Sequence, residues 1–181
     1  MRTPADRLKL LLDGGASARY HTQPYMPKQT VADHTYRMLA ILLAYMPGGP
    51  SDVLMRAALC HDVAECMTCD MPSPFKLANP ECSKIVAKAE RDVLVRAGLW
   101  YEDLLNDHER AWLRAADWLE LAMFARDQFY VGNRGAIPVF DAISKAWTDY
   151  PLDWPTEAEA LMGLLHAEMV SLRTITPIAG S

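Results

Sequence analysis

The sequence contains no apolar run that approaches the roughly 20 residues a helix needs to span a membrane. Its first residues, MRTPADRLKLLLDGG, place Asp6 and Asp13 on either side of a short leucine run. That arrangement is unlike a signal peptide, which has a basic start and a longer apolar segment. We therefore expect no membrane partner and a cytoplasmic location, which is the host cytoplasm if a phage encodes the protein.

Cysteine is scarce, with 4 residues in 181. Cys66 and Cys69 form one CxxC motif, but Cys60 and Cys82 do not supply the second pair that a structural zinc site needs. No βαβ pattern accompanies the motif, which disfavours a thioredoxin-type redox site. We expect reduced thiols, as is usual in the cytoplasm.

Positive charge is not in excess. The 18 lysines and arginines face 23 aspartates and glutamates, so the formal net charge is -5. This balance argues against a nucleic-acid partner. An anionic ligand would have to be met by a local group of basic residues.

Strand-like alternation is absent as well, whereas nearly every segment has helical periodicity. We expect an all-α fold: one domain over residues 1–181, built as a compact bundle of about six to eight helices. The segment CDMPSPFKLANP is expected to be a loop because its three prolines break helices. The expected helices cover about 4–14, 29–46, 51 to beyond 61, 81–97 and 106–130, with C-terminal helices within 138–174.

Ionisable residues interrupt the apolar faces of three of these helices. His34 lies in the second helix, His61 and Glu65 follow the apolar face of the third, and Asp117 lies in the fifth. Taken singly, each is better explained as a core residue with one hydrogen bond. Taken together, they predict that two imidazoles and two carboxylates meet, and a divalent transition metal would satisfy all of them.

Glu65 has three possible roles. It could be a fifth ligand, a solvated surface acid, or a base that orients an attacking water. We favour the third role, because a carboxylate near a metal can take or hold the proton of that water.

His34, the pair His61–Asp62 and Asp117 match the H…HD…D pattern of the HD superfamily of metal-dependent phosphohydrolases, which the chain resembles. The run HDVAECMTCDMPSPFK is similar to HDxxExxxGDxPxPxK of the YfbR-type 5′-deoxynucleotidases, with Cys69 in place of the usual glycine. The stretch ARYHTQP…QTVADHT also resembles short phage members, including DatZ-type dATP triphosphohydrolases. The resemblance covers residues 19–124.

The resemblance implies a catalytic centre with one divalent transition metal, for which Co, Mn, Zn and Fe are comparably suitable. Its ligands would be His34, His61, Asp62 and Asp117. Glu65 would position the water that attacks the α-phosphorus.

It also implies a nucleotide site. Arg19 would hold the α-phosphate through its guanidinium fork. Asp70, included with the catalytic residues, would bond the sugar 3′-hydroxyl and help reject ribose. Tyr20 stands where family members use tryptophan against the sugar or base. Thr22 lies where the purine edge is contacted, but a threonine does not identify the base.

Two lysines are candidates for the phosphates beyond the first, where an additional Mg²⁺ is an option. Lys76 follows Asp70 in the matched run. Lys84 shares a helix face with Lys88 and Arg91, and for this face an ordinary solvated surface is the slightly better interpretation.

The leading hypothesis is hydrolysis of the 5′ phosphoester of a 2′-deoxynucleotide at the α-phosphorus, with a tilt towards a phage-type dATP or dNTP triphosphohydrolase. The alternatives are a 5′-deoxynucleotidase acting on dNMPs, a non-catalytic nucleotide-sensing HD protein, and a cyclic-nucleotide or (p)ppGpp hydrolase.

The resemblance further implies a homo-oligomer, either a dimer or a larger ring. Core packing is the expected role for most of the tryptophans at 112, 118, 147 and 154, rather than an oligomer interface.

Overall fold

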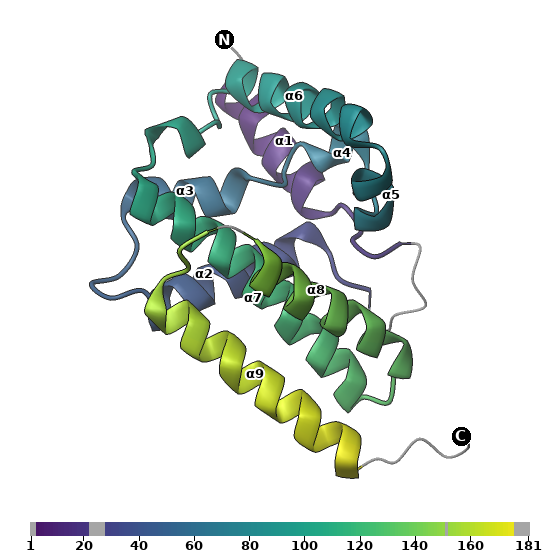
Figure 1. Cartoon of the computed structure of the whole chain (residues 1–181). Coiled ribbons are helices and arrows are strands. Elements are labelled where there is room, and N and C mark those ends of the chain that lie inside the picture. The colour runs from purple at the N-terminus through teal and green to yellow at the C-terminus, as the bar shows by residue number, and fades with distance from the viewer. Residues whose placement is uncertain (1–2, 22–27, 151, 176–181) are drawn as a thin grey trace.

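The computed structural model describes residues 3–21, 28–150 and 152–175, apart from the side chains at 73, 74, 77 and 175. Within these ranges the chain is helical and forms no strand, which confirms the all-α expectation (Figure 1). The longer helices are α1 (Pro4–Gly15), α2 (Val31–Tyr45), α3 (Asp52–Cys60), α6 (Pro80–Ala97), α7 (Asp107–Tyr130), α8 (Ile137–Asp149) and α9 (Thr156–Ile175). Two shorter ones are α4 (Glu65–Thr68) and α5 (Ser73–Ala78), with 3₁₀ turns at Glu102–Leu104 and Arg134–Ala136. None of the described helices is both long and apolar enough to cross a membrane.

The helix starts follow their sequence signals. Thr3 caps α1 and Thr30 caps α2, each in a reciprocal capping box with an aspartate three residues later. Asn106 caps α7 in the same way, with Glu109 as its partner. Such caps are each worth about 1 kcal/mol. The cap at Thr30 has a functional consequence, because it fixes the first turn of the helix that carries His34.

The larger hydrophobic core surrounds α7, which packs against α2, α8 and α9 (Figure 1). Trp112 of α7 is completely buried. Trp147 and Trp154 stack with ring centroids 4.0 Å apart and are also buried. These three tryptophans therefore pack in the core, as expected, and Trp118 is half-buried beside them.

A second, smaller core joins α1 and α6 to the turn after α3. Leu10, Val63 and Leu94 are among its members. Gly14 of α1 lies so close to this turn that a Cβ atom built on it would be 2.5 Å from the carbonyl oxygen of Val63. Only glycine permits this approach, which ties α1 to the segment that carries His61 and Asp62.

Two expectations about this region were wrong. The third helix ends at Cys60, so His61 and Asp62 lie in a turn and not on a continuous helix. The proline-rich segment is not entirely a loop, because Ser73–Ala78 forms α5. Pro74 is tolerated there since it occupies the first turn, where its missing N–H would have had no partner in the helix.

Cys69, which follows α4, adopts φ 63° and ψ 152°. This combination is close to a region that is essentially reserved for glycine, and holding another residue there costs about 1–3 kcal/mol. The sequence run that this segment resembles has glycine at the same place. The cysteine is therefore accommodated with backbone strain just before Asp70.

We expect Cys69→Gly to raise the melting temperature by a few degrees. The released strain of about 1–3 kcal/mol exceeds the extra chain entropy of glycine, about 0.5–1 kcal/mol, which leaves a net gain of about 1 kcal/mol. Thermal unfolding of Cys69→Ala is the matched control, because alanine keeps the Cβ atom and the strain. Equal melting temperatures for the glycine and alanine variants would contradict the strain.

Candidate functional site

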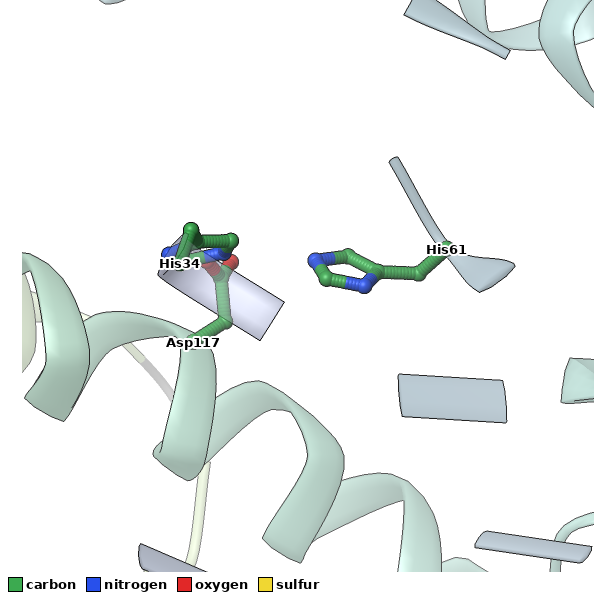
Figure 2. Close-up of side chains that lie close together, drawn as sticks. All are labelled: His34, His61 and Asp117. Carbon is green, nitrogen blue, oxygen red and sulfur yellow. The ribbon is translucent and has the colours of Figure 1, made fainter. Parts of the chain in front are cut away.

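Three side chains from distant parts of the sequence lie close together. His34 comes from α2, His61 from the turn after α3, and Asp117 from α7. One ligand atom from each lies within 4.8 Å of the others. Figure 2 shows the His61 ring pointing towards the His34 ring and the Asp117 carboxylate. Two imidazole nitrogens and a carboxylate oxygen at this spacing suit a divalent transition metal.

Both histidines present Nε2 to the cluster, because Nδ1 of each ring has a partner elsewhere. His34 Nδ1 lies 2.5 Å from a carboxylate oxygen of Glu120, and His61 Nδ1 lies 2.8 Å from the Ala58 carbonyl oxygen. Because a neutral imidazole that donates from Nδ1 has its lone pair on Nε2, this assignment leaves both Nε2 atoms available as ligands. Both are buried, and neither makes a hydrogen bond of acceptable geometry within the described residues. These orphaned nitrogens support the fit of a metal.

Asp62 lies beside both imidazoles. Its Oδ2 atom is 3.2 Å from His61 Nε2 and 3.6 Å from His34 Nε2. The same oxygen accepts a short hydrogen bond from Nη1 of Arg19, a side chain that is itself buried. The structure therefore gathers all four predicted metal ligands, with the predicted phosphate-binding arginine in contact with one of them.

The charges of the cluster are strongly coupled. Burial alone would lower the pKa of His61, but the neighbouring Asp62 and Asp117 outweigh it and raise that pKa to about 9. Burial would conversely raise the pKa of Asp62, yet His61 and Arg19 hold it well below its usual range. In the absence of a metal, protons and Arg19 balance these carboxylates. Metal binding must displace the protons and should weaken in acid.

Glu65 begins α4 one turn beyond Asp62 and is only 6% exposed. Burial, together with the negative charges of Asp62 and Asp70, raises its pKa to about 8, although Arg19 and Lys76 act in the opposite direction. Its Oε2 atom is buried without a hydrogen-bond partner among the described residues. The surface-acid interpretation is therefore wrong. Glu65 is a buried carboxyl group next to the cluster.

Two of the predicted nucleoside residues, Tyr20 and Asp70, contact each other. The backbone N–H of Tyr20 donates to Oδ2 of Asp70 at 3.2 Å, and the Tyr20 ring stacks on Phe124 with centroids 5.1 Å apart. Lys76 is near enough for its charge to affect Glu65. Thr22 lies outside the described residues.

Lys84 is placed elsewhere. It lies on the exposed face of α6, where it pairs with Glu81 at 2.8 Å, and Lys88 pairs with Asp92 on the same helix. Lys84 makes no described contact with the cluster. This placement favours the interpretation of Lys84 as part of an ordinary solvated surface over its assignment to the outer phosphates.

A pocket of about 280 Å³ opens beside the cluster, and the sequence interpretation did not identify most of its lining. His61 and Asp117 form one end. The rest is lined by Glu102, Leu105, Arg110, Leu113, Arg114 and Trp118. Arg110 and Arg114 lie seven and three residues before Asp117 on α7, so helical spacing could have placed them on the same face.

Glu120 was also missed. It is completely buried on α7 and contacts the metal-ligand candidate His34. The signal for it was its position three residues after Asp117, which puts both carboxyl groups on one side of the helix.

Residues 17–109 of the chain match the HD-domain family. No curated protein matches the chain significantly in sequence. Several solved structures share its fold, among them three that are covered over nearly their whole lengths.

One is the HD phosphohydrolase DatZ of cyanophage S-2L, in a structure with bound dA and one catalytic Zn²⁺ ion. It is 21% identical, with a TM-score of 0.64 over 94% of this chain and 98% of that one. The second is the PH0347 protein of Pyrococcus horikoshii OT3, which is 19% identical, with a TM-score of 0.68 over 90% of this chain and 98% of that one. The third is a conserved hypothetical protein of Pyrococcus furiosus, which is 20% identical, with a TM-score of 0.67 over 90% and 99%.

The matched segment is just over half of the chain and contains His34, His61, Asp62, Glu65 and Asp70. Asp117 lies beyond it in sequence, but α7 brings it to the same cluster. The chain belongs to the HD-domain family and has the fold of an HD phosphohydrolase.

Proposed function

We propose that this protein is a metal-dependent phosphohydrolase that cleaves the 5′ phosphoester of 2′-deoxynucleotides at the α-phosphorus, with a dNTP, and dATP in particular, as the preferred substrate. The observation that carries the proposal is the proximity of the metal-ligand cluster to a buried arginine and a buried glutamate. The likeness to DatZ, which binds dA and a catalytic Zn²⁺, supports the choice of substrate and metal class.

In this proposal His34, His61, Asp62 and Asp117 hold one divalent transition metal. When bound, the metal supplies Lewis-acid polarisation of a phosphoryl oxygen and lowers the pKa of water. The imidazole Nε2 atoms and carboxylate oxygens that would hold it already face one another.

Arg19 holds the α-phosphate. Its guanidinium group presents five N–H donors in a planar fork, of which one bonds to Asp62 in this structure. Burial alone would lower the pKa of Arg19, but the charges of Asp62, Asp117 and Glu65 outweigh burial and raise it. The arginine therefore remains a cation, suited to two non-bridging oxygens.

Glu65 orients the attacking water and takes its proton on a carboxylate oxygen. Its free, buried Oε2 atom is a suitable acceptor for that proton. On the nucleoside side, Asp70 accepts from the 3′-hydroxyl. Its contact with the Tyr20 backbone keeps it beside the ring that packs against the sugar or base.

The pocket beside His61 and Asp117 supports a substrate with more than one phosphate. Arg110 and Arg114 provide guanidinium groups for the phosphates that leave as tripolyphosphate. Lys76 remains a further candidate near Glu65, whereas the exposed Lys84 is a weaker one.

A 5′-deoxynucleotidase acting on dNMPs remains the second candidate function, because Arg19 and the cluster alone suffice for one phosphate. A non-catalytic sensor is disfavoured because the chain has a ligand residue at all four metal positions and also has Glu65.

Product analysis is the direct test. We expect Co²⁺- or Mn²⁺-loaded protein to convert dATP into deoxyadenosine and tripolyphosphate, resolved by ion-exchange chromatography. The variant Asp117→Asn should lose both the bound metal and the activity, since the negative charge of a ligand is removed without a change in volume. Turnover of dAMP alone would establish the nucleotidase instead. Metal binding without product from any deoxynucleotide would favour the sensor.

The burial of Glu65 has a consequence for stability in metal-free protein. An unfolded glutamate ionises at its ordinary pKa, whereas the folded protein resists ionisation until about pH 8. The resulting stability is fully present below pH 4 and is lost as the pH rises through 8. We expect Glu65→Gln to melt at a temperature that increasingly exceeds that of the wild type between pH 5 and 8, with a limiting gain of roughly 5 kcal/mol.

Glu157→Gln, at an exposed position in the first turn of α9, is the control, and its effect should not grow in this way. A Glu65→Gln effect that is constant from pH 5 to 8 would show that the carboxyl group ionises as freely as in the unfolded chain.

Arg114 allows a test of the outer-phosphate assignment. We expect Arg114→Leu to reduce kcat/KM for dATP by about 10- to 100-fold, the usual worth of a charge-assisted hydrogen bond, and to affect dAMP much less. Arg91→Leu is the matched control. Arg91, like Arg114, packs over an aromatic ring, but it lies on α6 and pairs with Asp103, away from the pocket. Equal losses with dATP and dAMP would exclude Arg114 from the outer-phosphate site.

A further inference from the structure

Glu120 is a carboxylate with 0% exposure in the larger core. Burying such a group costs several kcal/mol unless it is paired, and apolar residues of similar volume are often at least as stable. Both of its oxygens are engaged. Oε2 lies 2.5 Å from His34 Nδ1, and Oε1 accepts a hydrogen bond of 2.7 Å from Nε2 of Gln29 and lies 2.9 Å from Arg37 Nε.

Gln29 is itself held at both its side chain and its backbone. Its amide is buried against Glu120, while its backbone carbonyl accepts from the N–H of Arg19 at 2.8 Å. Two residues further on, the N–H of Val31 donates to the Ser17 carbonyl at 2.9 Å. The segment before α2 is thus pinned to the segment that carries Arg19. Gln29 can therefore fix the position of Glu120 instead of merely following it.

The ion pair with Arg37 does not explain why Glu120 is buried. Arg37 has a second partner, Asp127, whose Oδ2 atom lies 2.7 Å from Nη2. Asp127 is 36% exposed, so Arg37 could be neutralised there without a carboxylate in the core. The contact that needs a buried acceptor is the one with His34, which is itself completely buried.

We propose that Glu120, supported by Gln29, is the positioning residue of the metal site. Its Oε2 atom holds the proton of His34 on Nδ1 and fixes the plane of the ring, so that the Nε2 lone pair faces Asp117 and His61. Neither Glu120 nor Gln29 would touch the metal or the substrate. This inference rests on the metal site of the proposed function and adds the residues that set its affinity.

Metal affinity of the full chain provides the test, measured by competition between the protein and a chromophoric chelator for Zn²⁺ and for Co²⁺. Glu120→Gln preserves volume but cannot satisfy His34 and Gln29 with the same acceptors. We expect it to weaken the binding of both metals by about 10- to 100-fold, the range typical of such outer-shell partners. The visible absorption of bound Co²⁺ should also change, because the ligand field at His34 is altered.

Asp127→Asn is the matched control. It removes the other partner of Arg37 and leaves the contact between Glu120 and His34 intact. We expect its metal affinity and Co²⁺ spectrum to equal those of the wild type. A loss of affinity in Asp127→Asn as large as that in Glu120→Gln would reduce the role of Glu120 to general core stability and overturn the proposal.

A second variant keeps the proposal testable if Glu120→Gln folds poorly. Gln29→Leu removes one donor to Glu120 while leaving every ionisable group in place. We expect it to weaken metal binding in the same direction but less, and the two substitutions together should cost less than the product of their separate effects, because they act as one unit.

Unchanged metal affinity in both Gln29→Leu and Glu120→Gln would overturn the positioning role while leaving the metal site in place. Failure of the wild type to bind Zn²⁺ or Co²⁺ would instead overturn the metal site of the proposed function, and this inference with it.

Discussion

The complete burial of the His34 imidazole is the constraint on which the rest of the structure depends. A buried imidazole needs a partner at each nitrogen. Here Glu120 meets Nδ1, whereas Nε2 faces the carboxylates of Asp117 and Asp62 without a hydrogen bond and is left available as a ligand. These partners come from α7 and from the turn after α3. The packing of α2 against α7 is therefore set by polar requirements as well as by the apolar residues around them.

The smaller core acts as the support for the turn that carries His61 and Asp62. A turn has fewer internal hydrogen bonds than a helix, so its side chains are only as well placed as its surroundings allow. Val63 and Ala64 anchor this turn in the core, and α1 closes over it through the contact at Gly14. The division into two cores thus separates two tasks: α7 organises one side of the site, and α1 with α6 holds the other.

The helices and the convergence of the candidate ligands His34 and Asp117 were predictable, because both leave local signals. Capping residues such as Thr30 mark helix starts, and His34 and Asp117 interrupt apolar faces at helical spacing. The break after Cys60 was not predictable, because helical spacing continues from Leu54 and Ala58 to His61 and Glu65 across the turn. Glu120 was overlooked because its spacing from Asp117 places both carboxyl groups on one side of the helix but does not distinguish a buried glutamate from a solvated one. Only the contact between α2 and α7 does so.

The pairing of Arg19 with Asp62 links metal and substrate in the proposed function. Without a metal, the buried guanidinium is the main cation available to Asp62 besides the imidazoles. A divalent ion held by Asp62 would take over that neutralisation, and Arg19 would then be a buried cation short of a partner. An anionic phosphate supplies that partner at the same place. Because an unpaired buried charge is costly, this exchange favours phosphate binding after the metal rather than before it. It also provides a local positive charge for the nucleotide in a protein whose overall charge of -5 would otherwise repel it.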